Sequence, residues 1–164
     1  MMGAIMVRPA EPGDASEMAK LFFETVHAIN RRDYSSVEVN AWAPHMLSAE
    51  EWLARQEGKM VYAALEGDRV VGFAELEPSG HIDCFYTHKN HQGRGIGSLL
   101  LDRIEVRARD LRLSKLRAEV SFTAKSFFEH RGFRSLRRQE VLRRGVALRN
   151  FVMEKDLIPE PPQS

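Results

Sequence analysis

The sequence predicts an α+β fold built on a mostly antiparallel sheet. Apolar residues recur at helical spacing near the N-terminus and again after residue 95, whereas short β-type runs fill the middle and the end. A strand–helix–strand succession in the middle predicts a locally parallel or splayed strand pair within that sheet. The 164 residues show no repeat or linker, so we expect one domain over residues 1–157 and a disordered, proline-rich tail over 158–164.

The chain is predicted to begin with a strand over residues 4–8 and a helix. Asp14 and Glu17 have the pattern of a capping box, so the helix is predicted to begin there. Its buried face is predicted to carry Met18, Leu21, Phe22 and Val26.

Two shorter helices are predicted next. One covers residues 37–42 and stops before Pro44, because the residue that precedes a proline avoids helical geometry. The other is capped by Ser48 and ends near Gly58.

The hydrophobic period then changes to that of strands. Residues 60–65 and 69–76 are predicted strands joined by a tight turn at 66–68. Pro, Ser and Gly at 78–80 turn the chain into a third strand over 81–87. These strands are predicted to form an antiparallel meander.

A long helix over residues 95–111 follows, with its apolar positions at helical spacing. A further strand is predicted at 116–120 and a short helix at 123–130. Two last strands, around 139–142 and 146–154, are predicted to form a hairpin.

The composition excludes several classes of protein. Lys and Arg (24) nearly balance Asp and Glu (23), so a net charge of +1 gives the molecule no general attraction for nucleic acid or an anionic membrane. No apolar run approaches the roughly 20 residues that span a bilayer. The single cysteine, Cys84, allows no internal disulfide, and we expect a cytoplasmic protein without a nucleic-acid or membrane partner.

A glycine-rich turn from His91 to Gly97 separates the strand at 81–87 from the long helix. Glycines let the backbone approach an anion closely, and the free N–H groups of the helix start point at it. Arg94 is expected to add a mobile positive charge. A P-loop would need Gly-Lys-Ser/Thr and a dinucleotide site would need glycine at Ser98, so neither fits. A glycine-rich helix start without a ligand remains the alternative from these residues alone.

Two motifs resemble the signatures of the GCN5-related N-acetyltransferase (GNAT) superfamily. Gln92, Gly95 and Gly97 match Gln/Arg-x-x-Gly-x-Gly/Ala, and residues 121–133 are similar to Asn-x-x-Ala-x-x-Phe-Tyr-x-x-x-Gly-Phe. The resemblance spans about residues 5–157 and extends to the bacterial YafP-type acetyltransferases. It implies a strongly twisted sheet with helices on both faces, and acetyl-CoA inserted at the splayed central strands as the acetyl donor to a primary amine.

The resemblance also implies which residues bind acetyl-CoA. Its pyrophosphate is expected on the backbone N–H groups of Gly93, Arg94, Gly95, Ile96, Gly97 and Ser98. Its pantetheine arm is expected to pair with the backbone of Phe85, Tyr86 and Thr87. Further cofactor contacts are expected from Gln92, Ser121, Ala124, Lys125, Phe127, Phe128 and Arg131. Ser121 replaces the family's usual Asn, and Lys125 and Arg131 are candidates for the terminal phosphates.

Phe128 departs from the family pattern, because a tyrosine often stands there and protonates the departing thiolate. The proton is therefore expected from Tyr86 or a water, or the thiolate leaves unassisted. A thiol pKa near 8.5 makes thiolate a tolerable leaving group near neutral pH.

Acetyl transfer needs a neutral amine, and an amine with a pKa of about 10.4 is mostly protonated at pH 7, so a base is expected. Alternation places residues 81, 83, 85 and 87 on one face of their strand. Asp83 and His81 stand where similar family members place a base, and Glu75 is a third candidate. The alternatives are a structural ion pair for Asp83, a surface position for His81 and a structural role for Glu75. Cys84 is expected to point to the other side as a core residue. No His, Cys, Asp and Glu set has metal-ligand spacing, so no metal is expected.

Tyr34 and Trp42 lie in the least regular segment and are the candidates for acceptor contacts, with a core role for Trp42 as the alternative. The acceptor is expected to be a small molecule or a peptide or protein amine. A non-catalytic acetyl-CoA-binding regulatory module is the alternative function. An exposed edge strand near the C-terminus is a candidate contact for a homodimer.

Overall fold

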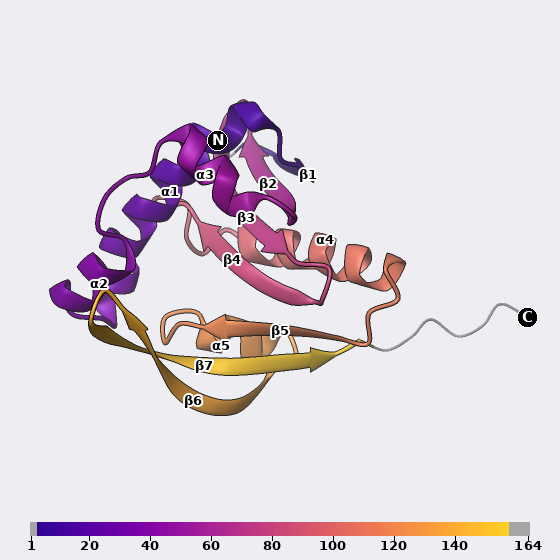
Figure 1. Cartoon of the computed structure of the whole chain (residues 1–164). Helices are drawn as coiled ribbons and strands as arrows, with labels where there is room; N and C mark the ends of the chain where they lie inside the picture. Colours follow the sequence, from indigo (N-terminus) through magenta and orange to yellow (C-terminus); the bar gives the residue numbers. More distant parts are fainter. Residues whose placement is uncertain (1–2, 158–164) are drawn as a thin grey trace, which may run out of the picture.

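The computed structural model describes residues 3–157, and the tail that was predicted to be disordered lies outside them. Seven strands of the described part form one sheet in the order β1-β2-β3-β4-β5-β7-β6 (Figure 1). The strands are β1 (Ile5–Pro9), β2 (Met60–Glu66), β3 (Arg69–Leu76), β4 (His81–Thr87), β5 (Lys115–Val120), β6 (Arg134–Arg143) and β7 (Val146–Asp156). The helices are α1 (Ala15–Ala28), α2 (Ser36–Trp42), α3 (Ala49–Gln56), α4 (Ile96–Asp110) and α5 (Lys125–His130). Across residues 3–157, no helix is both long and apolar enough to cross a bilayer.

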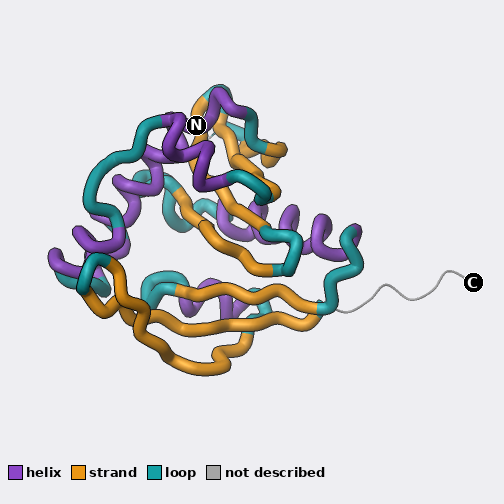
Figure 2. Tube along the Cα trace, in the orientation of Figure 1, coloured by secondary structure: helices purple, strands orange, loops and turns teal. Residues whose placement is uncertain are grey.

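β4 and β5 divide the sheet into two halves. Within the described chain they pair, in parallel, only at His81 with Arg117 and at Ile82 with Ala118, and beyond these pairs they separate. We call the separated segment the split. Figures 1 and 2 show β1–β4 with α1, α3 and α4 above the split, and β5–β7 with α5 below it. Every other neighbouring strand pair is antiparallel, so the predicted sheet with its splayed central pair is confirmed.

Two apolar clusters pack against the sheet. The cluster on the α4 side joins Leu100 and Ile104 of α4 to Leu116 and Met153 of the lower half. The other joins α1 and α3 to the opposite face of the upper half, and it contains the predicted buried residues of α1: Met18, Leu21, Phe22 and Val26. Because the α4-side cluster contains residues of both halves, it holds them together across the split.

A β-bulge in β4 changes which side chains share a face. Ala74 pairs with Phe85 and Leu76 with Ile82, so Glu75 stands opposite two residues, Asp83 and Cys84. Ile82 and Phe85 therefore both lie in the α4-side cluster. The predicted common face of residues 81, 83, 85 and 87 is wrong. The predicted opposite orientation of Cys84 is also wrong, because the polar ends of Glu75, Asp83 and Cys84 lie within 4.8 Å of one another.

The capping box predicted at Asp14 is also wrong. The Asp14 carboxylate accepts hydrogen bonds from the Arg8 guanidinium and from the Glu11 backbone N–H, both at 2.8 Å. Glu17 instead accepts from the backbone N–H of Val70 at 2.9 Å, which ties α1 to β3. Both acidic groups bind partners outside their own helix, which a local pattern does not reveal.

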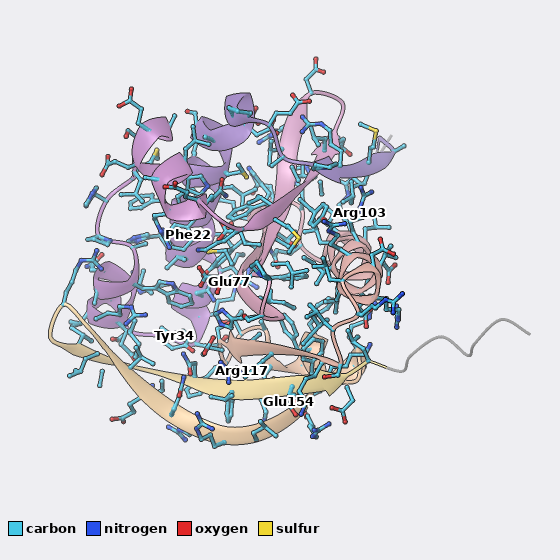
Figure 3. All side chains as sticks on the ribbon, turned by 45° about the vertical axis from the view of Figure 1, so that its right-hand side comes forward. Phe22, Tyr34, Glu77, Arg103, Arg117 and Glu154 are labelled. Carbon is cyan, nitrogen blue, oxygen red and sulfur yellow. The ribbon has the colours of Figure 1, made fainter. Side chains whose placement is uncertain are left out.

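Tyr34, an expected acceptor contact, instead connects the segment after α1 to the lower half. Its ring stacks on Phe122 with centroids 5.4 Å apart. Its hydroxyl donates to the Arg149 carbonyl at 2.7 Å and accepts from the Phe122 N–H at 3.0 Å. Figure 3 shows Tyr34 beside β7. Since Tyr34 is buried, this hydroxyl satisfies two backbone groups that water does not reach easily.

We expect Tyr34→Phe to lower the free energy of unfolding by about 1–3 kcal/mol, because it leaves a backbone donor and a backbone acceptor without their partner. Urea denaturation measures this loss. Tyr62→Phe is the matched control, since Tyr62 is buried but its hydroxyl makes no hydrogen bond to residues 3–157. Equal losses in the two variants would contradict the assigned role.

Candidate active site

A cavity of about 450 Å³ lies in the split. Its walls come from β4, the glycine-rich turn, the start of α4, β5 and the segment that leads into α5. The expected cofactor residues that line it are Phe85, Tyr86, Thr87, Gln92, Gly93, Gly95, Ile96, Gly97, Ser98, Ser121, Ala124, Phe127 and Phe128. Trp42, Asp83 and Glu119 also line it, whereas Tyr34 does not.

The glycine-rich turn presents a row of free main-chain donors to this cavity. Within residues 3–157, none of the N–H groups of residues 93–98 donates a hydrogen bond, and the Leu99 N–H is the first to do so, to the Gly95 carbonyl at 3.2 Å. Gly93 and Gly95 have φ angles of 74° and 78°, a left-handed conformation that favours glycine. Free donors with the positive end of the α4 dipole behind them are an arrangement that suits an anion.

Side chains behind the turn fix its position. Gln92 donates to the Thr87 carbonyl at 2.7 Å, and the Thr25 hydroxyl donates to the same carbonyl at 3.1 Å. His88 and His91, which flank the turn, are both buried, with their Nδ1 atoms 3.2 Å apart. Burial lowers the pKa of His88. The turn therefore rests on a packed layer of side chains.

The cations that were expected at the phosphates have other partners. Arg94 forms an ion pair with Glu66 at 2.5 Å, so it is not a mobile charge. Arg131 donates to two carboxylates of α4 at 2.6 and 2.8 Å, and the Lys125 ammonium lies 4.4 Å from the centroid of the Phe151 ring. In the part of the chain that the structure describes, no lysine or arginine lines the cavity. An anion there would be held mainly by the backbone.

Asp83 and Glu75, two candidate bases, share a lysine but differ in access. The Lys59 ammonium donates to Asp83 and, at 3.4 Å, to Glu75. Glu75 is only 2% exposed and also accepts from the Gln56 amide at 2.8 Å. Asp83 lines the cavity and Glu75 does not. Of these two carboxylates, Asp83 is therefore the one that an acceptor can reach.

His81, the third candidate base, lies between two carboxylates where β4 and β5 are still paired. Its Nδ1 is 3.1 Å from Glu77, and its Nε2 contacts Glu119 of β5. The hydrogen bond to Glu119 outweighs the cost of burial and, with the one to Glu77, raises the pKa of His81 to about 9. Figure 3 shows Glu77 between the two halves. A protonated imidazole has no free lone pair, which favours Asp83 over His81 as the base at neutral pH.

Glu119 lines the cavity but was not among the residues predicted for the site. Its strand was predicted, and the alternation of apolar and polar residues along it could have indicated this position. Since Leu116, Ala118 and Val120 are buried, Glu119 lies on the other face of the strand. The hydrogen bond from His81 lowers the pKa of Glu119, which is therefore a carboxylate at neutral pH.

Two aromatic residues, Tyr86 and Trp42, complete the wall beside Asp83. Their ring centroids are 6.5 Å apart. Burial raises the pKa of Tyr86 well above its ordinary value, so its phenol stays protonated and is available as a proton donor. Phe128 has no proton to give and packs against Phe85 with centroids 5.3 Å apart.

Two sets of side chains have their polar atoms close enough for a metal ion: Glu75, Asp83 and Cys84, and Glu77, His81 and Asp83. In both sets the carboxylates already contact Lys59 or His81. These cations compensate part of the negative charge of the carboxylates. The absence of a metal, which was expected from the sequence, stays a prediction.

Comparisons with known proteins point to one family. Residues 30–157 match the model of the acetyltransferase (GNAT) domain. The uncharacterized N-acetyltransferase YafP of Escherichia coli is 29% identical over 153 residues, which cover 93% of this chain and 96% of that protein.

Solved structures agree with this match. A GCN5-related N-acetyltransferase from Rhodopseudomonas palustris has a TM-score of 0.89 and 32% identity, over 96% of this chain and 98% of that one. The yncA protein of Salmonella typhimurium, solved with its cofactor acetyl-CoA, has a TM-score of 0.73 and 22% identity, over 99% of each chain. At that identity, the second likeness concerns the fold alone.

The His81 contacts predict a dependence of stability on pH. The pKa of His81 is higher in the folded than in the unfolded chain, so its contribution is fully present below about pH 6.5 and is lost as the pH rises through about 9. We expect a loss of about 2 kcal/mol in this window, measured by urea denaturation at pH 6 and pH 9.5. His81→Asn removes the titrating group. An identical pH dependence in this variant would contradict the assignment.

Proposed function

The chain belongs to the GNAT acetyltransferase family, and from this membership we propose that it transfers the acetyl group of acetyl-CoA directly to a primary amine. The observation that carries the proposal is the row of free N–H groups at residues 93–98, which faces a cavity between separated strands. The acetyl-CoA in the yncA structure, which has a similar fold, supports this choice of donor.

In the proposed complex, the N–H groups of residues 93–98 bind the pyrophosphate. Beyond Ile82 the edge of β4 that faces β5 has no strand partner within the described residues, which leaves room for the pantetheine arm along residues 85–87. The Thr87 carbonyl already accepts from Gln92 and Thr25, so the arm pairs with the other backbone groups of this edge. Gly97 lets the Phe127 ring pack closely against the start of α4, because an added Cβ would lie 3.2 Å from that ring. Ser121 and Ala124 contribute to the facing wall.

Acetyl-CoA supplies an activated thioester, and the residues of the cavity serve the transfer. As the amine nitrogen bonds to the acetyl carbon, the C–S bond breaks and its electron pair leaves on sulfur. Asp83 takes the proton of the amine, directly or through a water. Backbone N–H groups near Phe85 and Tyr86 stabilise the negative charge on the acetyl oxygen. The Tyr86 phenol, which its raised pKa keeps protonated, donates a hydrogen bond to the departing sulfur in place of the tyrosine that Phe128 replaces, and the thiolate takes its proton from water.

The first prediction of this proposal concerns acetyl-CoA binding. We expect Gly95→Val to weaken binding at least about tenfold, equivalent to about 1.4 kcal/mol, because a side chain disfavours the left-handed conformation that directs the N–H groups. Isothermal titration calorimetry measures the affinity.

Gly145→Val is the matched control for this measurement. Gly145 has a φ of 76° and, like Gly95, open space around an added Cβ, but it lies in the turn between β6 and β7. Both variants are expected to lose similar stability, whereas only Gly95→Val is expected to lose affinity. Unchanged affinity in Gly95→Val would contradict the anion site.

The second prediction concerns catalysis. We expect Asp83→Asn to lower kcat/KM for an amine about 100-fold or more, because an amide does not accept the proton, while acetyl-CoA affinity stays unchanged. Thiol release over an amine library measures turnover. Full activity in this variant would exclude Asp83 as the base. Wild-type binding of acetyl-CoA without turnover of any amine would favour the non-catalytic module.

A further inference from the structure

The charged side chains on the cavity wall favour some amines over others as the acetyl acceptor. We propose that the acceptor is a primary amine with no carboxylate next to the reacting nitrogen, and that Glu119, positioned by His81, selects it. This inference rests on the proposed acetyl transfer to amines. It concerns the end of the cavity away from the glycine-rich turn.

Two carboxylates line the cavity, one from each strand that borders the split. Among the described residues that line the cavity, Asp83 of β4 and Glu119 of β5 are the only acidic ones, and no lysine or arginine accompanies them. His91, the remaining titratable base in the lining, belongs to the glycine-rich turn. The side chains of Asp83 and Glu119 are 35% and 36% exposed, so both are accessible from the cavity.

The carboxylates of this wall outnumber the cations that contact them. Lys59 contacts Asp83 and the buried Glu75, and His81 contacts Glu119 and Glu77. Arg117 and Arg55 act on Glu119 and Tyr86 only at longer range and do not line the cavity. An ammonium group that enters the cavity at this end therefore meets the two carboxylates directly, which favours its binding.

His81 determines where the Glu119 carboxylate lies. One oxygen of Glu119 is bound by the His81 Nε2, and within residues 3–157 the other has no side-chain partner. The opposite ring nitrogen of His81 is bound by Glu77, so the imidazole is fixed from both sides. His81 is therefore a positioning residue, and Glu119 is the group that touches the acceptor.

This arrangement discriminates between an amine and the amino acid with the same side chain. A carboxylate one carbon away from the reacting nitrogen would lie close to Asp83 or Glu119, and like charges repel strongly where water is excluded. The aromatic walls of Trp42 and Tyr86 accept an apolar substituent and an ammonium group. The preferred acceptors are therefore simple amines and lysine side chains, and free amino acids are disfavoured.

The test compares acceptors that have a single amine and differ by one carboxylate: phenethylamine with phenylalanine, and tyramine with tyrosine. We expect kcat/KM at pH 7.5 to be at least about tenfold higher for the amine of a pair. Equal or faster turnover of the amino acids would overturn the inference and leave the proposed acetyl transfer intact. Turnover of none of the four compounds, with acetyl-CoA binding retained, would contradict both.

Two variants test the named residues. Glu119→Gln is expected to raise KM for the amine about tenfold, to leave kcat and acetyl-CoA affinity nearly unchanged, and to reduce the preference over the amino acid. His81→Asn is expected to raise KM in the same way, and the double variant to add little to either single one. Glu129→Gln, on the exposed surface of α5, removes the same charge and serves as the control. An unchanged preference in Glu119→Gln would overturn its role.

Discussion

The short pairing between β4 and β5 is the constraint on which the rest of the structure depends. Two residue pairs join the strands within the described chain, and their separation beyond Ile82 creates the cavity. The α4-side core keeps the halves together, and His81 bonds to Glu119 across the paired end. If β4 and β5 were paired along their whole length, the edge of β4 would be occupied and no passage would remain. The incomplete sheet is stable because the packing of the α4-side core compensates for the hydrogen bonds that β4 and β5 do not make.

The two ends of the cavity attract opposite charges, and different kinds of groups are responsible at each end. At the glycine-rich turn the attraction for an anion comes from backbone N–H groups and the α4 dipole, since Arg94 and Arg131 are held by carboxylates. At the other end Asp83 and Glu119 provide negative charge. Backbone donors are fixed in place by the fold, whereas long cationic side chains must be ordered on binding. The arrangement suits a donor with phosphate groups and an acceptor with an ammonium group.

Local patterns in the sequence predicted most of the fold. The helical and strand periods predicted the elements, Ser48 with Glu51 predicted a helix cap, and the glycines predicted the turn before α4, in which Gly95 has a left-handed conformation. The GNAT resemblance, carried by two motifs, is confirmed by the family match over residues 30–157. These signals are local because each depends on residues a few positions apart.

The features that were not predicted depend on contacts between distant segments. The bulge at Asp83 and Cys84 follows from the register of β3 on β4, and it reverses the alternation on which the common face was based. The charge of His81 depends on Glu119, which is 38 positions away in sequence. Burial and the choice of hydrogen-bond partner determine these features, and the spacing of nearby residues predicts neither of them.

A crystal structure of the protein with acetyl-CoA would show directly whether the N–H groups of residues 93–98 bind its pyrophosphate. We expect the pyrophosphate oxygens within hydrogen-bond distance of these N–H groups, and the acetyl group in the split near Asp83. A pyrophosphate bound elsewhere, with these N–H groups facing solvent, would contradict this expectation.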